Sequence, residues 1–214
     1  MDNPVEEFEQ DGYTVKLYQD EDAMSPREND NLTVIVDWHR RYELGDRKAS
    51  DVELDALRRG GFKLLARYLR RFEDVLWVQP IGMLDHSGVT IWVGGGSHWS
   101  DAAGWDSGTV GFAYVTKKRF EELCGSWPYK PKSFKGTAEK WLEHTSTEEI
   151  EEYDRYLRGD VYGYVIEDED GNHVDSCWGF IGGEYAQQEA KDALKSHLSY
   201  EVEQQQKLNQ CLAL

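Results

Sequence analysis

Short apolar runs separated by polar turns recur along the chain, and they predict a β-sheet with helices packed against it. Alternating or continuous apolar residues over four to nine positions are typical of strands. The second-to-last and last of these runs flank the turn Asp170-Gly171-Asn172, which predicts a hairpin. Pro80 places its own run at an edge or a bend, because proline cannot donate to a ladder. The predicted strands are residues 13–18, 32–38, 75–83, 89–93, 111–115, 161–167 and 173–180.

Apolar residues at helical spacing predict several helices between these strands. Gly60-Gly61 divides the first helix into two shorter ones. Thr145-Ser146-Thr147, followed by Glu148 and Glu149, has the pattern of a capping box and predicts that a new helix begins there. The predicted helices are residues 51–72, 116–124, 137–144, 147–158 and a last helix that starts near residue 184.

This order of elements indicates an α+β fold with a central, mostly antiparallel sheet of about five to seven strands and packed helices. Residues 1–12 are acidic and poor in apolar side chains, so we expect a flexible N-terminus. Residues 13–182 are expected to form a single domain. Residues 183–214 are expected to form a C-terminal helix and tail.

The net charge of the chain limits the binding partners that we expect. The 214 residues include 24 basic and 41 acidic side chains, a net charge of −17. Such a chain repels phosphate, so direct nucleic-acid binding is not expected unless one face is locally basic. Three alternative explanations of the acidity stay open, which are solubility, a salt-adapted host and a surface that imitates nucleic acid. Residues 51–72 form the one basic element, either a solvated face or a docking face for an acidic partner or a phosphate.

Cysteine usage and hydropathy predict a cytoplasmic protein with no membrane partner. Cys124, Cys177 and Cys211 are widely spaced and form no CxxC pair, which argues against a disulfide framework and for a reducing compartment. The N-terminus has no apolar signal core, and no apolar run approaches the roughly 20 residues that span a bilayer.

Two serine-containing bends are the main candidate for a functional site. Asp85-His86-Ser87-Gly88 follows one strand, and Trp105-Asp106-Ser107-Gly108 precedes the next. If these strands are neighbours, Asp85, His86 and Asp106 converge. Carboxylate and imidazole groups together suit a divalent metal or general acid–base catalysis. The alternative is that Asp-Ser-Gly serves only its tight turns. Four further residues are placed to join such a site: Asp37, His39, His98 and Asp101.

Binding roles are assigned to several polar and aromatic residues near these segments. Arg40-Arg41 is suited to hold a phosphate or carboxylate with two parallel hydrogen bonds, or to pair with surface acids. Serine hydrolysis is disfavoured, because adjacent residues such as His86 and Ser87 point to opposite faces of a strand and no Gly-x-Ser-x-Gly motif occurs. The candidate binding residues are His39, Arg40, Arg41, Ser87, Trp105, Ser107 and Asp160.

Four sequence blocks between residues 25 and 180 resemble a family of uncharacterised proteins from phages and integrated mobile elements. The chain departs from this family at residues 102–104, where relatives often carry a Cys and a Pro, and in its helical tail. The blocks are Asp30-Asn31-Leu32 through Trp38-His39-Arg40-Arg41-Tyr42 to Leu44-Gly45-Asp46; Leu84 to Gly88 with Trp105 to Val115; Tyr153 to Gly163; and Asp175-Ser176-Cys177-Trp178-Gly179-Phe180.

The resemblance implies a phage or mobile-element accessory role in the host cytoplasm and no particular chemistry. Together with the acidity and the aromatic content, it favours a non-catalytic binding protein that inhibits a host defence or nucleic-acid-processing complex. A metal-dependent hydrolase or phosphodiesterase that uses the two bends is the first alternative. A structural or regulatory phage protein without a small-molecule site is the second. No cofactor is expected, a divalent metal stays open, and the oligomeric state is undetermined.

Overall fold

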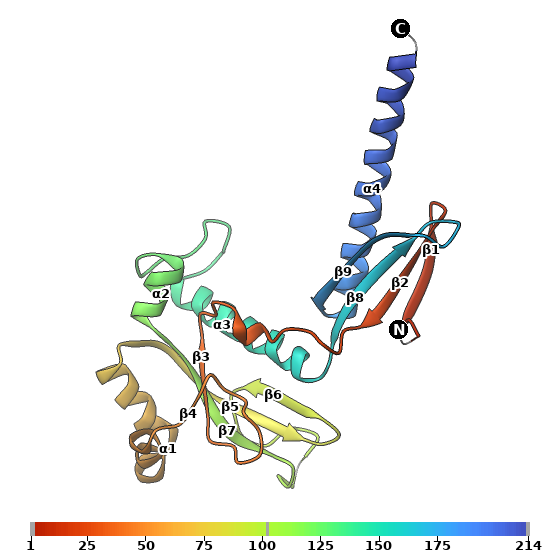
Figure 1. Ribbon diagram of the computed structural model, residues 1–214. Helices are drawn as coiled ribbons and strands as arrows, with labels where there is room; N and C mark the ends of the chain where they lie inside the picture. The colour runs from red at the N-terminus through yellow and green to blue at the C-terminus, as the bar shows by residue number, and fades with distance from the viewer. Residues whose placement is uncertain (1–2, 102, 213–214) are drawn as a thin grey trace. The chain divides into compact units, whose positions relative to one another are not determined.

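The computed structural model describes residues 3–101 and 103–212 and divides the chain into two compact units (Figure 1). The terminal unit comprises Met1–Met24 and Gly159–Leu214, and the central unit comprises Ser25–Arg158. Both boundaries between these units lie within residues 13–182, the range expected to form a single domain. The α+β class with mostly antiparallel strands is confirmed, and the strands are divided between two sheets. Residues 1–2 and 213–214 of the expected tails lie outside the described residues.

The terminal unit is a four-stranded antiparallel sheet covered by one long helix, α4 (Gly183–Leu212). Val15 and Leu17 alternate with half-exposed residues and pack beneath Ala186 and Leu194 of the helix. From Ser199 onward every described position of α4 is exposed, and Figure 1 shows the helix running past the end of this sheet. The strand order is β1 (Glu6–Gln10), β2 (Tyr13–Gln19), β8 (Val161–Glu167) and β9 (His173–Ile181).

Two features of the terminal unit were not foreseen. Strand β1 lies in the segment expected to be flexible, where it pairs with β2 from Glu6 to Gln10. Phe8 is the one apolar residue of β1 and packs against the core of the terminal unit, and a single apolar position gave no alternation to recognise. In β8, a Cβ at Gly163 would overlap the ring of Trp178 on β9, so glycine is needed for the indole to lie across the sheet.

The central unit holds a five-stranded sheet with helices on both faces. Only the short pair β3–β4 is parallel. The strand order is β4 (Arg47–Lys48), β3 (Val34–Asp37), β7 (Ser107–Thr116), β5 (Val75–Asp85) and β6 (Val89–Val93). The helices are η1 (Pro26–Glu28), α1 (Asp51–Phe72), α2 (Lys117–Cys124) and α3 (Ala138–Leu157).

Alternation along β7 separates two cores in the central unit. Phe112 packs with Leu65 and Leu69 of α1, whereas its neighbour Ala113 belongs to the core that contains Ile150 of α3. Successive side chains of a strand point to opposite faces, so α1 and α3 cover opposite faces of the sheet. Both faces of β7 are therefore buried.

Helix α1 begins with the capping box of Ser50 and Glu53 and is interrupted at Gly60 and Gly61. Gly61 has φ +61°, a left-handed conformation that favours glycine. The predicted division into two helices is thus confirmed. The second half, residues 62–72, leads directly toward β5.

The prediction that a new helix begins after Thr145 is wrong, because α3 is continuous from Ala138 to Leu157. Ser146 is fully buried inside it. The acid that was expected to close a capping box binds elsewhere: Glu149 accepts hydrogen bonds from the backbone N–H groups of Leu32 (2.6 Å) and Thr33 (2.8 Å). The Ser/Thr-x-x-Glu pattern served a tertiary contact at the start of β3 rather than a helix start.

Pro80 does not mark an edge strand, because β5 lies between β7 and β6. However, β6 pairs only with Ile81 to Asp85, so Pro80 comes just before this pairing starts. The β5–β7 register also shifts between Ile81 and Gly82. The missing proline donor is accommodated at a point where one side of β5 has no strand neighbour.

Candidate functional site

The two serine-containing bends lie side by side in the central unit, as their positions at strand ends predicted. Leu84 of β5 is paired with Ser107 of β7, and the backbone N–H of Asp85 donates to the carbonyl of Asp106 at 2.8 Å. The nearest side-chain pair across the bends is His86 Nδ1 and Asp106 Oδ2, 3.6 Å apart. Both of these side chains are more than half exposed.

The carboxylate of Asp85 is already engaged. Its Oδ2 accepts from Arg41 Nη2 at 2.6 Å, and its Oδ1 accepts from the hydroxyl of Tyr42 at 3.1 Å. Both oxygens therefore have donors from the segment that follows β3. Asp85 thereby fixes this segment against the sheet, with its carboxylate directed at Arg41 and Tyr42.

The first bend has the geometry of a tight turn. The N–H of His86 donates to the carbonyl of Gly88, and Ser87 has φ +58°. These contacts account for the Ser-Gly pair by local backbone conformation. Ser87 lies at the exposed tip of the turn that connects β5 and β6.

Asp101 organises the second bend and the segment before it, residues 94–101 and 103–106, which we call the aromatic loop. Its Oδ2 accepts from the hydroxyl of Ser107 (2.8 Å) and the N–H of Asp106 (2.9 Å), and its Oδ1 accepts from the N–H of Trp105 (3.2 Å). The Ser107 hydrogen bond is the main cause that lowers the pKa of Asp101. Ser107 Oγ in turn accepts from the N–H of His98 at 2.9 Å. Ser107 is thus a structural residue here.

The aromatic loop exposes two indoles. Trp99 and Trp105 are each 87% exposed, the largest values among the exposed large apolar side chains of the described residues. Behind them, the ring of His98 contacts Trp92 (centroids 5.1 Å apart) and Trp99 (5.3 Å). The site therefore displays exposed apolar surface. The hydrogen bonds of Asp101 hold part of the backbone that carries it.

The remaining candidates are dispersed. His39 stacks on Tyr42 and accepts from its N–H. Asp37 is 1% exposed and accepts from Lys48 and from the N–H of Gly45, so it is part of the fold. Arg40 is exposed. Asp160 belongs to the terminal unit, where its carbonyl accepts from the N–H of Gly182.

The part of the chain that the structure describes contains no group of three or more His, Cys, Asp or Glu side chains arranged to hold a metal ion.

Part of what defines the site was not predicted from the sequence. Tyr42 and Asp101 were not expected to organise the bends, because both contacts depend on tertiary placement. The only signal was the density of Asp, Ser, Gly and Trp in residues 97–108.

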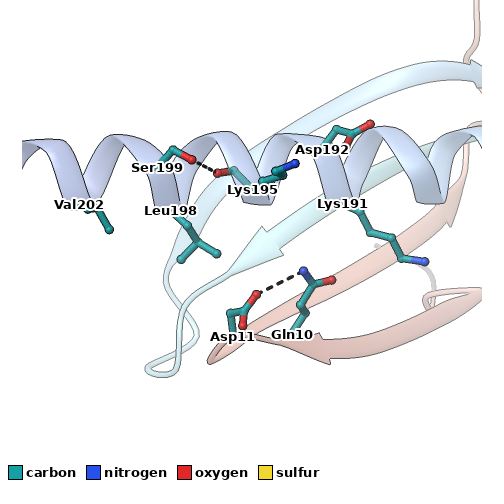
Figure 2. A pocket seen from close by; sticks show the side chains of 8 residues that line it. All are labelled: Gln10, Asp11, Lys191, Asp192, Lys195, Leu198, Ser199 and Val202. Carbon is teal, nitrogen blue, oxygen red and sulfur yellow. Dashed lines mark hydrogen bonds between the residues drawn. The ribbon is translucent and has the colours of Figure 1, made fainter.

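The terminal unit has a groove of about 540 Å³ where α4 passes the turn between β1 and β2 (Figure 2). Leu198 and Val202 extend from α4 on the side that carries Gln10 and Asp11. Its lining combines a few apolar, amide and charged groups and offers no nucleophile with a neighbouring base. We assign no chemistry to this groove.

Among the helices described, none is both long enough and apolar enough to cross a membrane. No family model, no curated protein and no solved structure matches this chain.

Proposed function

We propose that the protein is a non-catalytic binding protein of a phage or mobile element, which contacts a host protein through the aromatic loop and thereby inhibits a defence or nucleic-acid-processing complex. The observation that carries the proposal is the exposure of Trp99 and Trp105 at 87% each. Tryptophan is strongly enriched among the residues that dominate binding energy in protein interfaces.

The hydrogen bonds of Asp101 support this role. A loop that is ordered before binding loses less conformational entropy when it binds, so more of the contact energy appears as affinity. Asp101 holds Trp105 through its backbone N–H and holds Ser107 through its hydroxyl. These hydrogen bonds therefore order the backbone that carries Trp105.

The chemistry of the bends supports binding over hydrolysis. A carboxylate that acts as a general base must be directed at the reacting group. The carboxylate of Asp85 is directed at Arg41 and Tyr42, which hold it in an ion pair and a hydrogen bond. The phage or mobile-element origin rests on the four sequence blocks alone.

The test is affinity capture from a host lysate with the full chain, compared with the double variant Trp99→Ser/Trp105→Ser. We expect a protein that the wild type retains and the double variant loses, since truncating two central aromatic side chains typically weakens binding by about 100-fold or more. Tyr200→Ser, which removes an aromatic side chain 61% exposed on α4, is the matched control and should retain the partner.

Two results would contradict the proposal. Equal capture by the wild type and the double variant would show that the aromatic loop is not part of the interface. Hydrolysis of bis(p-nitrophenyl) phosphate with Mg²⁺ or Mn²⁺ that is lost in Asp106→Asn would show catalysis at the bends.

Asp101→Asn gives a further test of the loop. It keeps both indoles but removes the charge from the loop's hydrogen bonds, and it should weaken capture by about five- to tenfold.

A further inference from the structure

Four cationic side chains gather on the exposed face of α1. Lys63, Arg67, Arg70 and Arg71 line a shallow hollow of about 500 Å³, and no other residue contributes to its lining. All four are exposed. We call this surface the basic face.

The spacing of the four residues follows from helix geometry. Positions i, i+4, i+7 and i+8 share one side of a helix, and a rise of 1.5 Å per residue spreads them over about 12 Å of axis. Leu65 and Leu69, which pack on the sheet, lie on the opposite side of the same helix. The packing that anchors α1 therefore turns the four cations outward together.

The basic face is not neutralised within the described residues. None of its four cations has an Asp or Glu oxygen within 4.0 Å there, whereas Arg59 in the first half of α1 pairs with Asp55 at 2.8 Å. Arg67 has a like charge at three neighbouring helix positions, which are Lys63, Arg70 and Arg71, and like charges at such spacing repel. In a chain with 41 acidic residues this concentration of unpaired positive charge calls for an external anion.

The lining indicates which anion. The centre of a protein interface combines arginine with aromatic and other apolar residues, and the hollow on α1 has no apolar residue in its lining. Contacts to a nucleic-acid backbone are instead made largely by Arg and Lys with phosphate oxygens.

We propose that the basic face binds the phosphate backbone of a nucleic-acid strand without reading its sequence. This inference is independent of the aromatic loop and goes beyond the proposed protein contact. It also differs from the expectation based on the net charge of −17, because the central unit has 20 basic and 22 acidic residues, a net charge of only −2. The repulsion expected from the whole chain does not originate at this face.

The test uses the full chain and fluorescence anisotropy with a labelled single-stranded DNA of 20 nucleotides, in 25 to 200 mM NaCl. Binding through four phosphate contacts predicts that the logarithm of affinity falls with the logarithm of salt with a slope of about −3. Oligonucleotides of different sequence should bind within about twofold of one another. Absence of binding at 25 mM NaCl would overturn the proposal.

Arg67→Gln/Arg71→Gln should weaken binding by about ten- to fiftyfold at 50 mM NaCl and make the slope shallower by about 1.5. The matched control is Lys132→Gln/Lys135→Gln, which removes the same charge from exposed lysines elsewhere in the central unit. An equal loss in both double variants would mean that only overall charge matters, and would overturn the assignment to α1. Thermal melting should show that both variants are folded.

Competitors at matched ionic strength identify the ligand chemistry. Unlabelled oligonucleotide should displace the probe, while polyglutamate at the same charge concentration should displace it at least tenfold less well. Equal displacement by polyglutamate would show that the face accepts any polyanion and would overturn the phosphate assignment. Displacement by a few millimolar inorganic phosphate would show a site for single phosphates, and would overturn strand binding.

Discussion

The terminal unit and the central unit both pack helices on antiparallel strands, yet their surfaces differ in charge. The terminal unit has 4 basic and 19 acidic residues, a net charge of −15, whereas the central unit has 20 and 22, a net charge of −2. Nearly all of the net negative charge of the chain thus belongs to one unit, because the acidic residues of the central unit are balanced by basic ones. The total of −17 is an average over two surfaces that repel or attract different partners.

The difference also separates the places where binding is proposed. The basic face on α1 and the two exposed indoles of the aromatic loop belong to the central unit. The terminal unit carries the acidic strand β1 and the exposed end of α4. A conclusion from whole-chain charge, such as the exclusion of nucleic acid, therefore applies to the terminal unit and does not transfer to the central unit.

The largest expected difference between the two units comes from substitutions in their hydrophobic cores. Leu194 is fully buried under α4 in the terminal unit, and Ile150 is 1% exposed in the central unit. Replacing either by alanine removes buried methylene groups and leaves a cavity, which costs about 2 to 5 kcal/mol of unfolding free energy. Because the two side chains belong to different hydrophobic cores, we expect each substitution to loosen its own unit.

Hydrogen exchange followed by peptide mass spectrometry measures this directly. Leu194→Ala should accelerate exchange in β2 and β8 and leave β5 and β7 protected, and Ile150→Ala should do the reverse. If one substitution deprotects both units to the same extent, the chain unfolds cooperatively as a whole. The two units would then be separate in their contacts but would unfold together.

The buried ion pair of the central unit gives a smaller effect. Glu53 is 4% exposed and accepts from Arg47 at 2.6 and 2.9 Å and from the hydroxyl of Ser50. Glu53→Gln leaves Arg47 without its partner and should cost about 2 to 3 kcal/mol, reduced from the cost of a fully buried pair because Arg47 is partly exposed. Urea unfolding at pH 7 measures the loss. The matched control is Glu167→Gln, because the side chain of Glu167 is 26% exposed whereas that of Glu53 is 5% exposed, and its effect should be smaller.

The pH dependence of this pair has a defined sign. Burial alone would raise the pKa of Glu53, but the Arg47 and Ser50 hydrogen bonds outweigh it and lower the pKa. A depressed folded-state pKa adds stability above the unfolded value of about 4.3. That stability is lost as the pH falls through the folded value. The stability difference between wild type and Glu53→Gln should therefore shrink below about pH 4, and a constant difference down to pH 3 would contradict the pairing.

Elements with a strong local signal were predicted correctly from the sequence. The hairpin around Gly171 and the break in α1 at Gly60 and Gly61 each depend on residues within one turn of the element. Errors arose where a side chain serves a distant contact. Glu149 has the spacing of a capping acid, but it binds the backbone of Leu32 and Thr33, so α3 continues through the expected boundary.

The candidate site shows the same limit. Its location was predictable, because the end of one strand and the start of an antiparallel neighbour lie side by side. Asp85 and Asp106 are joined in this way by a backbone hydrogen bond. Which partner each carboxylate takes was not predictable. Arg41 and Tyr42 reach Asp85 from a segment 44 residues and 43 residues earlier in the chain. Exposure of Trp99 and Trp105 follows only from the folded loop, since aromatic residues are usually assigned to a core.

The smallest expected effect is that of NaCl concentration on the stability of the two units. Repulsion among 19 acidic and only 4 basic residues destabilises the terminal unit at low ionic strength, and NaCl screens it. Raising NaCl from 20 to 300 mM should stabilise the terminal unit by about 0.5 to 1 kcal/mol, a few degrees in melting temperature for a unit of this size. The central unit has a net charge of −2 and should change less. Hydrogen exchange of β8 against β5 at the two salt concentrations measures both units in one sample. An equal gain in both would show that the acidity acts on the chain as a whole.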